Sequence, residues 1–90
     1  MPVFMVERQF AEQLEASPET AAEINRINDE AGVRWLRSFL SADKRKTFCL
    51  YEADDMDAIR TAAVRAGLPA DAIVELSGVI AADGSFEPTR

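Results

Sequence analysis

Five side chains in this sequence could carry chemistry if the fold brings them together. Glu7 could act as a general base, since burial raises the pKa of a carboxyl group. Arg37 could hold a carboxylate or phosphate through two parallel hydrogen bonds. Cys49 could act as a nucleophile, and Trp35 and Tyr51 could form the aromatic walls of a binding site.

Each of these residues also has a purely structural interpretation. The structural alternative for Glu7 is an ion pair with Arg8, Arg34 or Arg37. Arg37 could instead form an ion pair at a subunit interface. A cysteine within a strand is usually a small buried hydrophobic group, and aromatic side chains most often pack in a core or an interface.

The composition removes several classes of chemistry. The 90 residues contain no histidine and one cysteine, so Ser-His-Asp and Cys-His systems cannot form within the chain. The commonest transition-metal ligand is missing as well. The acidic run Asp54-Asp55-Met56-Asp57 lacks the glycine and the many oxygens of a calcium loop, and helix capping accounts for it. We therefore expect no metal site and no cofactor.

Charge and hydropathy also argue against two classes of partner. Sixteen acidic and ten basic residues give a net charge of −6, whereas nucleic-acid binding needs a basic stripe. No apolar run approaches the ~20 residues that cross a bilayer. The opening MPVFMVERQF lacks the pattern of a signal peptide, and a lone cysteine forms no intrachain disulfide. We expect a cytoplasmic protein that binds neither nucleic acid nor membranes.

Turn and capping residues predict the elements that must position these side chains. Helix-start and glycine-stop signals frame two helices, and runs of β-forming residues frame four strands. The predicted elements are a strand over 2–10, a helix over 18–31 capped by Ser17, strands over 33–41 and 46–53, a helix from the N-cap Asp54 to about 66, and a strand over 72–80.

The order β-α-β-β-α-β predicts an α+β fold of the ferredoxin-like kind. This fold is a four-stranded antiparallel sheet with both helices on one face. We expect one such domain over residues 1–80, followed by a turn and tail over 81–90. A single compact domain of this mass should expose about 5,200 Å² of surface.

Strand alternation predicts which side chains face the helices. An aliphatic and aromatic set is expected under the helices: Phe4, Val6, Leu36, Leu40, Phe48, Leu50, Val74 and Leu76. A mixed set is expected on the open face: Val3, Met5, Glu7, Val33, Trp35, Arg37, Phe39, Thr47, Cys49, Tyr51, Ile73, Glu75 and Ser77. A one-residue slip in strand pairing would move one strand's set to the other face.

An open face of that composition is too apolar to remain uncovered in water. One interpretation is a homodimer in which two open faces meet, anchored by Trp35, Phe39 and Tyr51. The other adds a small-molecule cavity between the faces, lined by Glu7, Trp35, Arg37, Cys49 and Tyr51. These five residues are therefore the candidate ligand-binding set, and no catalytic residue is assigned.

Several strings in the sequence resemble one bacterial family. They are GVRWLRSF at 32–39, DKRKTFCLY at 43–51, AIR at 58–60 and GLPADAIVEL at 67–76, together with MVER at 5–8. The resemblance is to domain of unknown function 4242, also described as nickel-binding-protein-like. It implies a ferredoxin-like dimer and a relative that binds nickel. Arg37 stands where relatives often carry histidine, so nickel binding is not carried over to this chain.

Three functional hypotheses follow. The first is a homodimeric small-ligand-binding or accessory protein that uses its open sheet face. The second, by analogy of fold, is a cofactor-independent isomerase or oxygenase with Glu7 or Tyr51 as acid or base and Arg37 orienting an anionic substrate. The third is a nickel-binding protein, which the absence of histidine disfavours.

Overall fold

The structure, a computed structural model, describes residues 1–89. Two helices and six strands make up this part of the chain. In chain order they are β1 (Val3–Gln9), α1 (Pro18–Ala31), β2 (Arg34–Leu40), β3 (Lys46–Glu52), α2 (Met56–Ala66), β4 (Ala72–Leu76), β5 (Gly78–Ile80) and β6 (Phe86–Pro88).

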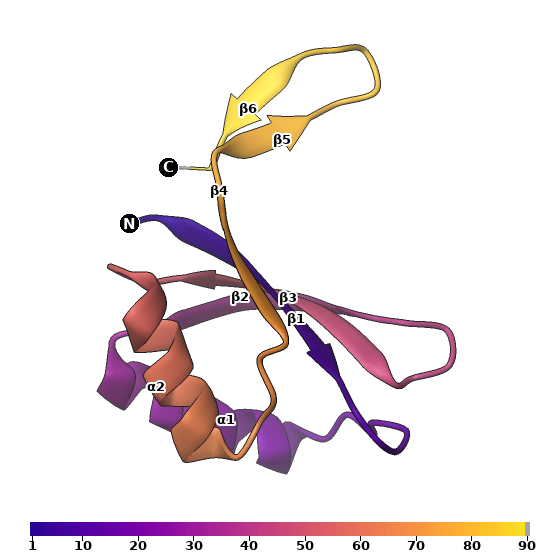
Figure 1. Ribbon diagram of the computed structural model, residues 1–90, viewed down its shortest axis with the longest axis vertical. Helices are drawn as coiled ribbons and strands as arrows, with labels where there is room; N and C mark the ends of the chain where they lie inside the picture. Colours follow the sequence, from indigo (N-terminus) through magenta and orange to yellow (C-terminus); the bar gives the residue numbers. More distant parts are fainter. Residues whose placement is uncertain (90) are drawn as a thin grey trace.

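Four of the strands form one antiparallel sheet in the order β2-β3-β1-β4. Both helices lie on the same side of this sheet (Figure 1). The ferredoxin-like α+β fold predicted from the sequence is thereby confirmed. β1 is central, because it pairs with β3 on one side and β4 on the other.

The ends of the helices follow the local sequence. The Ser17 hydroxyl accepts a hydrogen bond from the Thr20 amide and so caps α1, as predicted. The second cap lies one residue later than predicted, since Asp55 rather than Asp54 accepts from the Ala58 amide, at 2.9 Å. Gly32 ends α1 in the left-handed conformation, with φ of 74°.

The hydrophobic core lies between the sheet and the helices. Phe4, Val6 and Ile59 are the largest fully buried side chains. Cys49 and Tyr51 of β3 pack against them in the same cluster. The core cluster therefore contains three residues that the sequence placed on the open face, Val33, Cys49 and Tyr51.

The predicted division of the sheet into two faces is wrong for β3 and β4 and in part for β2. In β4, Ile73 pairs with Val6 and packs against the core, whereas Val74, which was expected under the helices, is exposed. Val6 pairs with Cys49 and Phe4 with Tyr51, so these side chains share the helix-covered face. Phe48 and Leu50, which alternate with them, consequently face away from the helices.

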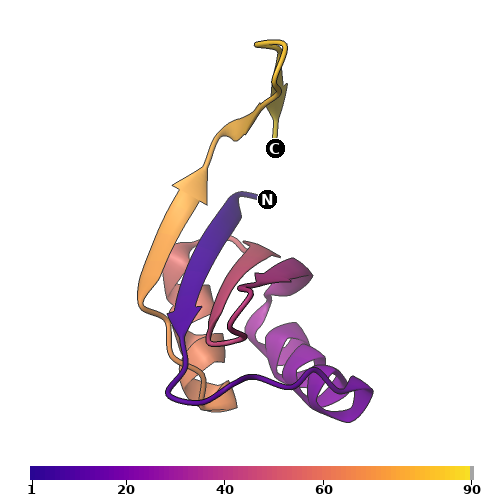
Figure 2. The same ribbon diagram turned by 90° about the vertical axis from the view of Figure 1, so that its right-hand side faces the viewer.

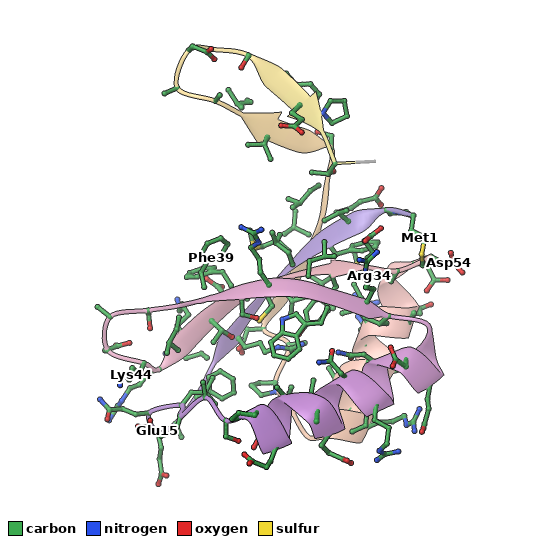
Figure 3. The ribbon with its side chains drawn as sticks, turned by 180° about the vertical axis from the view of Figure 1, so that it is seen from behind. Met1, Glu15, Arg34, Phe39, Lys44 and Asp54 are labelled. Carbon is green, nitrogen blue, oxygen red and sulfur yellow. The ribbon has the colours of Figure 1, made fainter. Side chains whose placement is uncertain are left out.

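A bulge between Trp35 and Arg37 shifts the register of β2. Trp35 accordingly packs against the core, while Leu36 and Arg37 are both exposed. Phe39 lies on the open face as predicted, and Figure 3 shows it pointing away from the helices.

The predicted strand over 72–80 divides into β4 and β5. β5 leaves the main sheet and pairs with β6, which lies in the predicted tail. We call the segment 78–88 the arm; Figures 1 and 2 show it projecting from the body of the protein. The last residue of the predicted tail, residue 90, lies outside the described residues.

Within residues 1–89, no helix is both long enough and apolar enough to cross a membrane.

The arm depends on glycine at its first position. A methyl group at Gly78 would lie 2.6 Å from the Glu87 carbonyl oxygen and would overlap the Phe86 ring. Gly78→Ala should therefore open the arm, seen as faster amide hydrogen exchange across 78–88, while exchange in β1 stays unchanged. Ser77→Ala, just outside the arm, is the control. Equal exchange rates in Gly78→Ala and the parent protein would show that the arm tolerates the methyl group.

Candidate functional site

The five residues predicted to form a ligand site do not lie together. Trp35, Cys49 and Tyr51 lie beneath the sheet, on its helix-covered face. Glu7 and Arg37 lie on the open face, because Glu7 follows the buried Val6 and Arg37 follows the bulge. The sheet separates the two groups, so one cavity on the open face cannot contain all five.

The group beneath the sheet lines a cavity of about 320 Å³ between the sheet, α1 and the segment that precedes α1. Its walls are mainly apolar and include a few polar side chains. The lining residues are Arg8, Phe10, Leu14, Glu15, Ala16, Ser17, Thr20, Ala21, Ile24, Trp35, Ser38, Leu40, Thr47, Cys49, Tyr51 and Leu68. Apolar walls with a few convergent polar groups are typical of small-molecule sites.

Arg8 is the one charged side chain in the cavity wall that is buried, with 4% of its surface exposed. Its Nη2 donates to the Tyr51 hydroxyl at 3.1 Å, and its Nη1 donates to the Pro69 carbonyl oxygen. Its Nε is buried without a hydrogen-bond partner among residues 1–89. No carboxylate of the described chain lies within ion-pair distance of it.

Sequence reasoning named Arg8 only as an ion-pair partner for Glu7 and missed its place in the cavity. The signal was present in β1. Arg8 follows Phe4 and Val6 at intervals of two, so a strand that buries the first two must carry the third to the same face. The ion-pair partner of Glu7 is instead Lys46, at 3.4 Å.

Tyr51 lies beside Arg8 in the cavity wall. Burial raises the pKa of the Tyr51 phenol above its ordinary value of 10.0, and the neighbouring Arg8 cation partly opposes this shift. The phenol is therefore neutral at physiological pH and keeps its proton. Because its oxygen already accepts from Arg8, the O–H group can donate to another acceptor.

The other polar groups of the wall are held in place locally. The Trp35 indole donates to the Ser38 hydroxyl at 2.9 Å. Cys49 is buried, and its thiol lies 3.5 Å from the Thr47 hydroxyl. These contacts orient the wall and leave the Arg8 guanidinium as its dominant electrostatic feature.

The open face contains a second, wider hollow of about 810 Å³, between the sheet and the arm. The sheet contributes apolar side chains and Arg37, and the arm contributes Glu87 on the other side. The full lining is Val3, Leu36, Arg37, Phe39, Leu50, Val79, Glu87, Pro88 and Thr89.

Within residues 1–89, the side chains that could bind a transition metal do not lie close enough together to form a site. No group of three or more cysteine, aspartate or glutamate side chains is placed to hold a metal ion there. The one thiol is buried in the core, and the chain has no histidine. The residues in place therefore do not fit a transition-metal site within one protomer.

The sheet order and the two helices on one face define a small α+β protein of the ferredoxin-like class, with a cavity beneath its sheet. A family model described as nickel responsive protein SCO4226-like matches residues 4–76. The chain belongs to this SCO4226-like family. The match supports the nickel-related family that the sequence resembled, under this description rather than as domain of unknown function 4242.

The fold is also found in a solved structure. The crystal structure of SCO4226 from Streptomyces coelicolor A3(2) superimposes with a TM-score of 0.64 at 18% sequence identity. The match covers 82% of this chain and 94% of that chain. At this identity the likeness supports the fold. A search of the curated proteins found no match.

The raised pKa of Tyr51 can be measured directly, because it is the only tyrosine of the chain. Titration followed by phenolate absorbance should have a midpoint above 10.0, and the same protein unfolded in urea should titrate near that value. Because the pKa of Tyr51 is raised in the folded state, the contribution of the neutral phenol to the free energy of unfolding is complete below the unfolded-state pKa. It is lost as pH rises through the folded-state pKa. A folded-state midpoint at or below the unfolded one would contradict the burial of the phenol.

Proposed function

We propose that this protein is a homodimer that binds a small molecule in the cavity beneath each sheet and uses its open sheet face for self-association. The observation that carries the proposal is the buried Arg8 cation in the wall of an apolar cavity, without a carboxylate partner among the described residues. The ligand site thus moves from the open face, where the sequence suggested it, to the other side of the sheet.

The arm and the open face support self-association. Val79, Ile80 and Phe86 of the arm are 58%, 76% and 55% exposed. Phe39 of the open face is 53% exposed. A two-stranded hairpin is marginal on its own in water, and apolar surface of this kind is normally covered. The exposed surface of 5962 Å² also exceeds the about 5,200 Å² expected for a compact chain of this mass.

A second copy of the chain is the partner that the charges favour. Arg37 on the open face and Glu87 on the arm line the same hollow, and neither forms an ion pair within residues 1–89. A two-fold interface brings each patch of one protomer against the partner's matching patch, so the arm of each copy can fill the hollow of the other. Glu87 of one protomer would then meet Arg37 of its partner.

Charge exchange tests this interface. Size-exclusion chromatography with light scattering should give the dimer mass for the parent protein at micromolar concentration. Arg37→Glu and Glu87→Arg should each shift the equilibrium toward the monomer, because like charges then meet across the interface. The double variant should recover the dimer.

The control for charge exchange is Arg60→Glu, on the exposed surface of α2. Arg60 is ion-paired with Asp57 at 3.2 Å and lies outside the hollow. It should leave the dimer intact. A monomeric parent protein, or single variants that dimerise as the parent does, would overturn this interface.

No observation favours the enzyme hypothesis over binding. Tyr51 lies beneath the sheet, whereas Arg37 lies above it, so the two cannot act on one substrate within a protomer. Glu7, the other acid-base candidate, is engaged with Lys46.

For nickel, the family description makes a direct measurement necessary. Carboxylates and one buried thiol are a poor donor set for this ion compared with imidazole-containing sites. Isothermal titration of the dimer with Ni²⁺ should therefore give no stoichiometric binding at micromolar concentration. The matched control is a variant with histidine introduced at two facing positions of the open face, Arg37→His with Leu50→His. Tight stoichiometric binding by the parent protein would show that the chain has a nickel site after all.

A further inference from the structure

We infer that the cavity beneath the sheet binds an apolar molecule with a single carboxylate group, held by Arg8 and Tyr51. This inference rests on the proposed ligand-binding function and names the chemical class of the ligand. The family description concerns nickel, and binding of a metal cation does not require a positively charged side chain in the site.

The buried charge is the first step of the argument. Removing a guanidinium from water without an opposite charge costs several kcal/mol. Its two existing acceptors, the Tyr51 hydroxyl and the Pro69 carbonyl, are both neutral. A ligand anion in the cavity would supply the missing charge, whereas a neutral or cationic ligand would leave it uncompensated.

The hydrogen-bond donors indicate a carboxylate. The guanidinium is a planar fork of N–H donors that matches the two oxygens of a carboxylate. The neutral Tyr51 O–H lies beside it and has its own proton to donate. Arg8 and Tyr51 are thus two neighbouring donors in the cavity wall.

The rest of the cavity limits the ligand to one negative charge and an apolar body. Phe10, Leu14, Ile24 and Leu68 are among the apolar residues that line the cavity. The only acidic residue of the lining, Glu15, is exposed, and Figure 3 shows its side chain directed away from the body of the protein. A second negative group would find no further cation in the wall, because Arg8 is the only basic residue of the lining. A volume of about 320 Å³ lies at the lower end for small-molecule sites, which suits a medium-chain or single-ring acid.

The test uses Trp35, which lines the cavity and is the only tryptophan of the chain. Octanoate added to the full-length protein should change the Trp35 fluorescence and saturate, and it should raise the melting temperature. Octanamide, which has the same chain length without the charge, should bind about tenfold to a hundredfold more weakly.

Two variants test whether octanoate binding depends on Arg8 and Tyr51. Arg8→Met keeps much of the buried stem and should weaken octanoate binding by about tenfold to a hundredfold, with little effect on octanamide. Tyr51→Phe removes only the hydroxyl and should weaken octanoate binding by about twofold to tenfold. Arg60→Met, at an exposed arginine on α2, is the matched control and should bind octanoate as the parent does. Should Arg8→Met fail to fold, the comparison of Tyr51→Phe with the parent and of octanoate with octanamide still decides the question.

The outcomes separate this inference from the proposed function. Equal affinity for octanoate and octanamide would retain a ligand-binding cavity but overturn the carboxylate class. Octanoate binding that Arg8→Met and Tyr51→Phe leave unchanged would place the ligand elsewhere and overturn the inference. Absence of any saturable change with either compound would overturn both the inference and the cavity as the ligand site.

Discussion

The two-residue alternation of side chains along β1 is the constraint on which the rest of the structure depends. β1 is the central strand, and burial of Phe4 and Val6 fixes which of its faces lies under the helices. Arg8 lies two residues after Val6, so the same alternation buries its charged guanidinium beneath the sheet. Antiparallel pairing with β1 then determines which side chains of β3 face the helices, because Tyr51 and Cys49 lie opposite Phe4 and Val6.

The sheet therefore has two unlike surfaces. Beneath it, an apolar cavity adjoins one buried charge, an arrangement that costs stability. Above it, Phe39, Arg37 and the arm form a broad, partly apolar hollow. The separation matters for the proposed function, because ligand binding on one side and self-association on the other would not compete for the same residues.

The candidate site was predictable only in part. Trp35, Cys49 and Tyr51 were predicted on the open face together with Glu7 and Arg37, but they lie on the other face and line the cavity beneath the sheet. Phe48 and Leu50 look more like core residues than Thr47 and Cys49 do. Hydrophobicity therefore predicted that Phe48 and Leu50 face the helices and that Thr47 and Cys49 face away from them. Strand pairing decided otherwise, since a neighbouring strand must match its register to the buried residues of β1.

By itself the sequence determined the order of the helices and strands, the cap at Ser17 and the ferredoxin-like topology, because those depend on local signals and on connection lengths. Only the tertiary structure decided the faces of the sheet, the bulge in β2 and the arm formed by β5 and β6. It alone brought Arg8 beside Tyr51, which lies 43 positions away in the chain. Such contacts depend on the register between strands distant in sequence, and one residue of shift reverses every side chain.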